Sequence, residues 1–128
     1  MGLLDNFKPF NFDEGAAGLS VTKNGVTFNR SVSTKLGQPK YVVLLLSQEE
    51  KMIAVKVCSE SDEHAAVFCK TKEEKPIAIR WNSKDLLLTI QDMMEWKLTE
   101  CNGYRVDGKF IPEEKAILFD FKNATAIL

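Results

Sequence analysis

The 128-residue chain lacks several features that would assign it quickly to a functional class. Its longest apolar run, residues 41–46 (YVVLLL), is far too short to cross a bilayer. The N-terminal segment has no basic stretch followed by a long apolar core, so it does not predict a secretory signal. With 17 basic and 18 acidic residues the formal net charge is −1, and no overall field draws the protein to nucleic acid or anionic lipid. We therefore expect a cytoplasmic protein with no membrane partner.

Cysteine and histidine are also scarce, with three cysteines and one histidine in the chain. Cys58, His64 and Cys69 are the closest set, but no two cysteines have the tight spacing that structural zinc sites use. An odd number of scattered cysteines fits free thiols better than a disulfide framework. The sequence also offers no evident nucleophile–base pair and no glycine-rich phosphate loop. We expect no metal, no cofactor and no enzymatic activity.

The chain does contain regular alternation of apolar and polar residues, interrupted by turn residues. Residues 19–29 (LSVTKNGVTFN) alternate around Asn24-Gly25, which predicts a β-hairpin with a type I′ turn at that pair. Asn29 can cap a short helix over 30–36, which Gly37 would end. The apolar run at 41–46 predicts a strand buried on both faces, and KMIAVKVC (51–58) predicts its hairpin partner. Residues 1–18 have no clear period and are interpreted as an N-terminal arm.

The second half of the chain repeats this order. IRWN (79–82) matches VTFN (26–29) at an offset of 53, and a longer helix is predicted near 83–96. EEKAILF (113–119) then matches EEKMIAV (49–55) at an offset of 64. We therefore predict an α/β fold of mostly antiparallel hairpins with two helices. Its two tandem strand–helix–hairpin repeats, 25–57 and 78–121, would form one compact barrel-like domain within residues 19–128.

The two predicted repeats should share one hydrophobic core, because the inward positions of each would otherwise remain exposed. The predicted members are Val26, Phe28, Leu36, Val43, Leu45, Ile53 and Val55 from the first repeat, and Ile79, Trp81, Ile90, Ile117 and Phe119 from the second.

Residues 21–57 (VTKNGVTFNRSVSTKLGQPKYVVLLLSQEEKMIAVKV) resemble the AbrB/SpoVT family of swapped-hairpin DNA-binding domains. The shared order is a strand, a Gly turn, a β segment, a short helix ending in KLG and a strand hairpin. Two such copies in one chain are similar to the MraZ branch, in which both repeats close one barrel. The proline that usually precedes the family's helix is Asn29 here, and Asn82 in the second copy. The resemblance implies a small transcription regulator that binds duplex DNA.

Basic residues lie near the start of both repeats. If the copies pair about a pseudo-twofold axis, these residues would form one face able to contact phosphates. Arg30 and Arg80 would be best placed to reach bases, because a guanidinium can donate two hydrogen bonds to guanine. The alternative interpretation is that they are ordinary surface charges. The candidate DNA-binding residues are Lys23, Arg30, Lys35, Arg80 and Lys84.

A second hypothesis is a non-catalytic protein-interaction or assembly module that does not bind DNA. Exposed aromatic residues often anchor protein interfaces. The candidate partner-binding residues are Phe7, Phe10 and Phe12 in the arm and Trp96 at the end of the second helix. Such a module would bind itself, as a homo-oligomer, or another protein.

Overall fold

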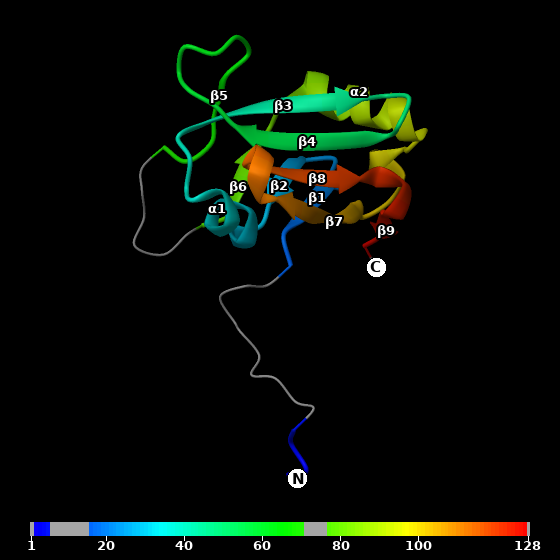
Figure 1. The fold of residues 1–128 in the computed structure, drawn as a ribbon. Helices are drawn as coiled ribbons and strands as arrows, with labels where there is room; N and C mark the ends of the chain where they lie inside the picture. The colour runs from blue at the N-terminus through cyan, green and yellow to red at the C-terminus, as the bar shows by residue number, and fades with distance from the viewer. Residues whose placement is uncertain (1, 6–15, 71–76, 128) are drawn as a thin grey trace.

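The computed structural model describes residues 2–5, 16–70 and 77–127 and shows a mixed α/β fold (Figure 1). Its α-helices are α1 (Arg30–Leu36) and α2 (Lys84–Met94), and single 3-10 turns cover Leu98–Glu100, Pro112–Glu114 and Phe121–Asn123. The strands are β1 (Gly18–Thr22), β2 (Gly25–Phe28), β3 (Tyr41–Ser47), β4 (Met52–Val57), β5 (Ala66–Val67), β6 (Ile79–Trp81), β7 (Tyr104–Ile111), β8 (Ala116–Asp120) and β9 (Thr125–Ala126).

The strands form one antiparallel sheet that curls into a half-barrel (Figure 1). Eight of them follow the order β5-β3-β4-β8-β7-β1-β2-β6, and β9 pairs with β7. The predicted α/β class, with antiparallel hairpins and two helices, is confirmed. Among the described residues, neither helix is long and apolar enough to cross a membrane.

Both predicted helices form, and each begins at a capping side chain. The Asn29 side chain accepts a hydrogen bond from the Val32 backbone N–H (3.3 Å), and Gly37 ends α1 in the left-handed region at φ 77°. The Ser83 hydroxyl accepts from the Leu86 N–H (3.2 Å) at the start of α2. Asp85, in the first turn of α2, carries the charge that the positive end of a helix favours.

The turn between β1 and β2 differs from the prediction. Thr22 pairs with Gly25, so Lys23 and Asn24 form the turn, and neither has a positive φ. The type I′ turn predicted at Asn24-Gly25 is therefore wrong. Gly25 is instead a paired strand residue at φ 146°, where a Cβ would lie 2.6 Å from the Trp81 carbonyl oxygen. Glycine is required here by the close approach of β6.

An aromatic cluster fills the centre of the half-barrel. The ring of Phe28, which is fully buried, lies 5.5 Å from Phe68, 5.1 Å from Trp81 and 6.0 Å from Phe119. Edge-to-face contacts of this kind add to the free energy gained by burial. Of the predicted core, Val26, Phe28, Leu36, Ile53, Val55, Ile79, Ile90, Ile117 and Phe119 are buried, and Trp81 packs partly exposed against them.

The prediction that β3 is buried on both faces, with Val43 and Leu45 in the core, is wrong. Leu45 is 48% exposed, whereas Val42 is fully buried. The register explains the difference, because directly paired residues project on the same face of a sheet. Leu44 pairs with the buried Val55, whereas Leu45 pairs with Ala54 and Val43 with a lysine on the outer face.

Replacing Phe28 with Ala should lower the free energy of unfolding by about 3–5 kcal/mol, because it empties the centre of the aromatic cluster. Urea denaturation would measure the loss. The matched control is Leu45→Ala, which removes an exposed side chain and should cost far less. Equal losses for the two variants would contradict this description of the core.

The two long hairpins turn through a lysine in the left-handed region, Lys51 at φ 57° and Lys115 at φ 50°. A side chain in this region is strained, whereas glycine is not. Lys51→Gly and Lys115→Gly should therefore each raise the free energy of unfolding, by up to about 1 kcal/mol. Lys109→Gly, within strand β7, should lower it. A loss of stability at both turns would show that the turns are not strained in this way.

Candidate nucleic-acid interface

A row of polar side chains crosses four adjacent strands on the outer face of the half-barrel. Arg105 on β7 pairs with Ser20 on β1, Ser20 pairs with Thr27 on β2, and Thr27 pairs with Arg80 on β6. Directly paired residues project on the same face, so the four side chains lie in one line. Both arginines are exposed, and Ser20 and Thr27 are partly exposed. We call these four residues the Arg–Ser–Thr–Arg row.

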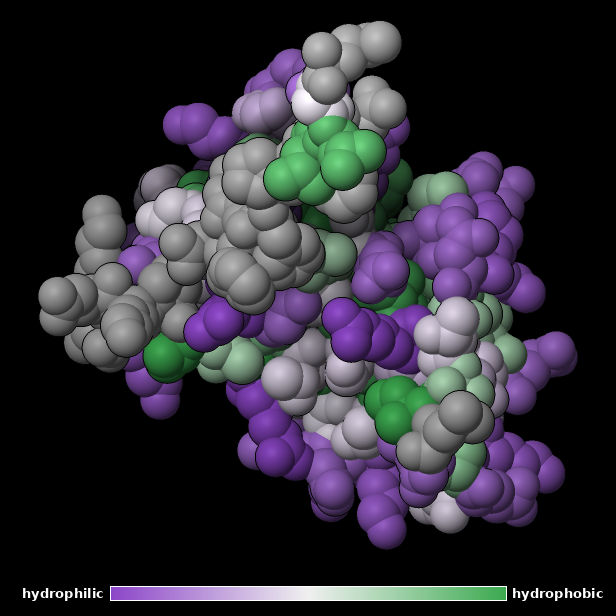
Figure 2. Space-filling view, turned by 90° about the horizontal axis from the view of Figure 1, so that it is seen from below, coloured by the Kyte–Doolittle hydropathy of each residue, from purple (hydrophilic) through white to green (hydrophobic). Residues whose placement is uncertain are grey.

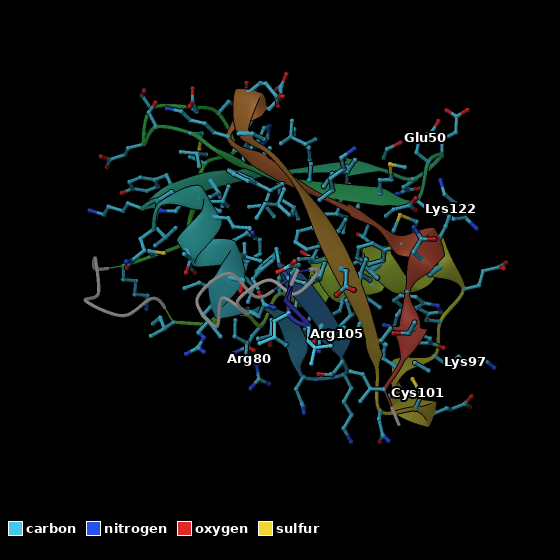
Figure 3. All side chains as sticks on the ribbon, turned by 60° about the horizontal axis from the view of Figure 1, so that its bottom comes forward. Glu50, Arg80, Lys97, Cys101, Arg105 and Lys122 are labelled. Atoms are coloured by element: carbon cyan, nitrogen blue, oxygen red, sulfur yellow. The ribbon has the colours of Figure 1, made fainter. Side chains whose placement is uncertain are left out.

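The two arginines lie at the ends of the row. Since neighbouring strands lie about 4.8 Å apart, the path along the curled sheet from the Arg80 backbone to the Arg105 backbone is about 14 Å, or three strand spacings. Figure 3 shows both on the underside of the sheet beside β1 and β2, away from Glu50 and Lys122. On the underside as a whole, hydrophilic side chains surround smaller hydrophobic patches (Figure 2).

One end of the row lies at the β1–β2 turn. The Arg80 guanidinium donates a 3.0 Å hydrogen bond to the Asn24 carbonyl oxygen, which brings Arg80 beside Lys23 in the same turn. The side-chain oxygen of Asn82 lies 3.0 Å from where a Gly25 Cβ would stand, and Lys84 begins α2 two residues later. The structure therefore places three of the predicted DNA-binding residues, Lys23, Arg80 and Lys84, at this end.

The other end of the row lies near the start of α1. The Arg105 guanidinium lies over Gly18, with its nitrogens 3.6 Å from the position of a Gly18 Cβ. The Asn29 N–H donates to the Gly18 carbonyl oxygen (2.9 Å), and Arg30 follows as the first residue of α1. Arg30 is thus near Arg105. Lys35 lies in the last turn of α1 and is not part of the row.

The charge on this face is mainly positive. Among the described residues that project outward from β7, β1, β2 and β6, the acidic one is Asp107, and its carboxylate lies 3.8 Å from the Arg105 guanidinium. Both partners are more than half exposed, so the ion pair contributes little to stability and leaves Arg105 able to exchange partners. The row combines guanidinium and hydroxyl donors, which are the groups that contact phosphate oxygens.

Arg105 was absent from the residues predicted from the sequence. It lies 85 positions after Ser20 in the chain, and only the pairing of β7 with β1 brings the two together. The alternation within YRVDGKFI indicates that Arg105 projects away from the buried Val106, but not which strand it faces.

The predicted partner-binding residue Trp96 has a packing role. Its ring stacks on Tyr104, with centroids 3.8 Å apart and planes at 8°, and lies 5.9 Å from Phe121. Trp96 remains partly exposed, so its role in binding a partner stays a prediction. Phe7, Phe10 and Phe12 lie outside the described residues.

The cysteines do not form a reactive cluster. Cys69 is buried, and burial raises the pKa of its thiol, against a smaller lowering by a hydrogen bond with Ser33. Desolvation and the charge of Asp62 raise the pKa of Cys58. Both thiols are therefore protonated at neutral pH and are poor nucleophiles. Within the described residues, no three His, Cys, Asp or Glu side chains lie together as metal ligands would.

Comparison of the chain with protein-family models, with curated proteins and with solved structures finds no match. The resemblance to the AbrB/SpoVT family therefore stays a prediction.

Replacing Trp96 with Ala should lower the free energy of unfolding by about 1–3 kcal/mol, because it removes a stacked aromatic pair and part of its buried area. Thermal unfolding followed by near-UV circular dichroism would measure the loss. Leu88→Ala, at a side chain that is 57% exposed on α2, is the control and should change little. A Trp96→Ala variant as stable as the parent would contradict the packing role.

Proposed function

We propose that the protein is a non-enzymatic regulator of AbrB/SpoVT type that binds duplex DNA through the Arg–Ser–Thr–Arg row. The observation that carries the proposal is the alignment of Arg105, Ser20, Thr27 and Arg80 across four paired strands. The path of about 14 Å along the sheet between the arginine backbones is comparable with the major groove of B-DNA, which is about 12 Å wide. Each guanidinium can then reach the phosphates of one groove wall.

The strands between the arginines suit the groove itself. β1 and β2 form an antiparallel hairpin joined by a two-residue turn and lie between β7 and β6, so the outer face of the sheet, and not a free ribbon, would lie against the groove. Ser20 and Thr27 project from it toward the bases, and their hydroxyls can donate or accept hydrogen bonds. Short hydroxyl side chains read sequence weakly, so the proposed binding depends mainly on phosphate contacts and tolerates many sequences.

We also propose that the fold is a tandem repeat, and the strand register supports this. The paired stretch of β4 and β8 is centred on Ala54 and Leu118, which are 64 residues apart. That of β2 and β6 is centred on Thr27 and Arg80, which are 53 apart. These separations equal the two offsets found by aligning EEKAILF with EEKMIAV and IRWN with VTFN. A local twofold axis relating the repeats would pass through both pairs.

Hydrogen bonds at the two hairpin turns support the same symmetry. The Phe121 N–H donates to the Lys51 carbonyl oxygen, and the Val57 N–H donates to the Lys115 carbonyl oxygen, both at 2.9 Å. A shift of 64 residues converts one bond into the other, and both lysines have a left-handed backbone. Each turn thus bonds reciprocally to the other repeat.

The alternative proposal, a partner-binding module without DNA affinity, retains Trp96 and the arm aromatics as candidates. It is favoured by the partial exposure of the Trp96 ring beside Tyr104. DNA binding is the better supported of the two, because it assigns a role to an aligned set of guanidinium and hydroxyl side chains on the exposed face of the sheet.

A salt titration of binding to a mixed-sequence duplex tests the proposed function. Affinity should fall steeply as salt rises, by about 0.9 log units per log unit of salt for each phosphate neutralised. Arg80→Ala with Arg105→Ala should weaken binding and reduce that slope by about 1.8, since two contacts are lost. The double variant Arg30→Ala with Arg80→Ala should also weaken binding and reduce the salt slope. Fluorescence anisotropy of a labelled duplex measures both quantities.

The matched control is Lys97→Ala with Lys122→Ala, which removes the same charge from positions away from the row (Figure 3). This variant should keep the slope of the parent protein. Absence of binding at low salt would refute the assignment to this face. So would a control variant, Lys97→Ala with Lys122→Ala, whose salt slope falls as much as that of Arg80→Ala with Arg105→Ala.

A further inference from the structure

The two end strands of the sheet, β5 and β6, lie on either side of a gap in the half-barrel. In the part of the chain that the structure describes, β5 pairs with β3 and β6 pairs with β2, and no strand joins β5 to β6. Figure 1 shows both strands at the left of the half-barrel. The rings of Phe68, which follows β5, and Trp81 on β6 have centroids 6.0 Å apart. The two ends of the sheet therefore meet through aromatic side chains.

A recess of about 400 Å³ opens beside these rings, and small-molecule sites have volumes of about 300–1,000 Å³. Core residues form its floor, since Phe68, Cys69 and Ile79 line it and are 3%, 6% and 9% exposed. Val67 and Ile77 lie at its mouth and are 45% and 53% exposed. The recess thus leads from the solvent to the hydrophobic core between the two ends of the sheet.

The charged residues that line the recess, among those described, are both cationic. Lys70 follows β5 and Arg80 lies on β6, and both are exposed. No described acidic residue lines it, although acidic residues outnumber basic ones in the chain, 18 to 17. A guanidinium has five N–H donors, and the hydrogen bond from Arg80 to the Asn24 carbonyl oxygen uses one of them. An apolar recess with a cationic rim favours an apolar ligand that carries an anionic group.

We propose that the recess binds a small apolar carboxylate. The hydrocarbon part of the ligand lies against Phe68, Ile79 and Trp81, and its carboxylate lies at the rim, against Lys70 and Arg80. Burial of the hydrocarbon part provides most of the affinity. The carboxylate accepts charge-assisted hydrogen bonds, which fix the orientation of the ligand in the recess.

Calorimetric titration of the parent protein with octanoate tests the proposal. Affinity should rise about fourfold for each CH₂ group added from butanoate to octanoate, because each added group is buried. Octylamine has a chain of the same length and the opposite charge. It should bind more weakly than octanoate by a factor on the order of ten or more.

Lys70→Gln tests the cationic rim without changing the Arg–Ser–Thr–Arg row. This variant should weaken octanoate binding by a factor on the order of three to ten, because a charge-assisted contact is lost. Arg80→Gln should act in the same way. The matched control is Lys97→Gln, which removes a charge from a residue that does not line the recess and should leave the affinity unchanged. An equal loss of affinity in Lys97→Gln and Lys70→Gln would overturn the proposal.

Fluorescence quenching by 8-bromooctanoate locates the ligand, because bromine quenches a tryptophan only at short range. The chain has two tryptophans, Trp81 in the recess and Trp96 stacked on Tyr104. In a Trp96→Phe variant, 8-bromooctanoate should quench the emission of Trp81. In a Trp81→Phe variant, it should leave the emission of Trp96 unchanged.

Three further results would overturn the proposal: no octanoate binding by the parent protein, an affinity independent of chain length, or quenching of Trp96 alone. Leu3 and Leu4 of the same chain are 98% and 69% exposed and are the competing occupants. Leu3→Ser with Leu4→Ser should leave the octanoate affinity unchanged, and a rise would assign the recess to these leucines instead. None of these measurements contains DNA, so their failure is distinguishable from a failure of the proposed DNA binding.

Discussion

The pairing of β4 with β8 is the interaction on which the rest of the fold depends. Its five residue pairs join segments 64 positions apart, so this contact closes a long loop that local structure cannot close. Ile53 and Val55 project inward with Ile117 and Phe119, and all four are buried. Once the two hairpins are joined here, β3 and β7 lie on the flanks of the central strands. Their free sides then determine where β5 and β1 can pair.

Local signals in the sequence predicted much of this fold. A capping residue predicted the first helix, since the Asn29 side chain accepts a hydrogen bond from the next turn. Alternation predicted the inward face of β4, because KMIAVKVC contains both apolar residues, which face the core, and polar residues, which mark the outer face. The same reasoning could not orient β3. A run of apolar residues has no polar positions to mark its outer face, so the register with β4 decides that Leu44 points inward and Leu45 outward.

The candidate site was less predictable than the fold, because its residues meet through pairing between distant strands. The predicted residues Lys23 and Arg80 lie near one another, because Arg80 donates a hydrogen bond to the Asn24 carbonyl oxygen in the turn that contains Lys23. The predicted set also contains Lys35, which the structure places outside the row. Arg105 could be recognised only when the β1–β7 register was known. A residue's face can be inferred from alternation, but its cross-strand neighbour cannot.

The two sides of the proposed axis at Thr27 and Arg80 differ in chemistry. On one side the row continues through Ser20 to Arg105. The corresponding residues on the other side are Val67, which is 45% exposed, and its partner Tyr41. One side is therefore polar and the other mainly apolar. This difference is what we expect if the polar side alone contacts phosphates in the proposed DNA binding.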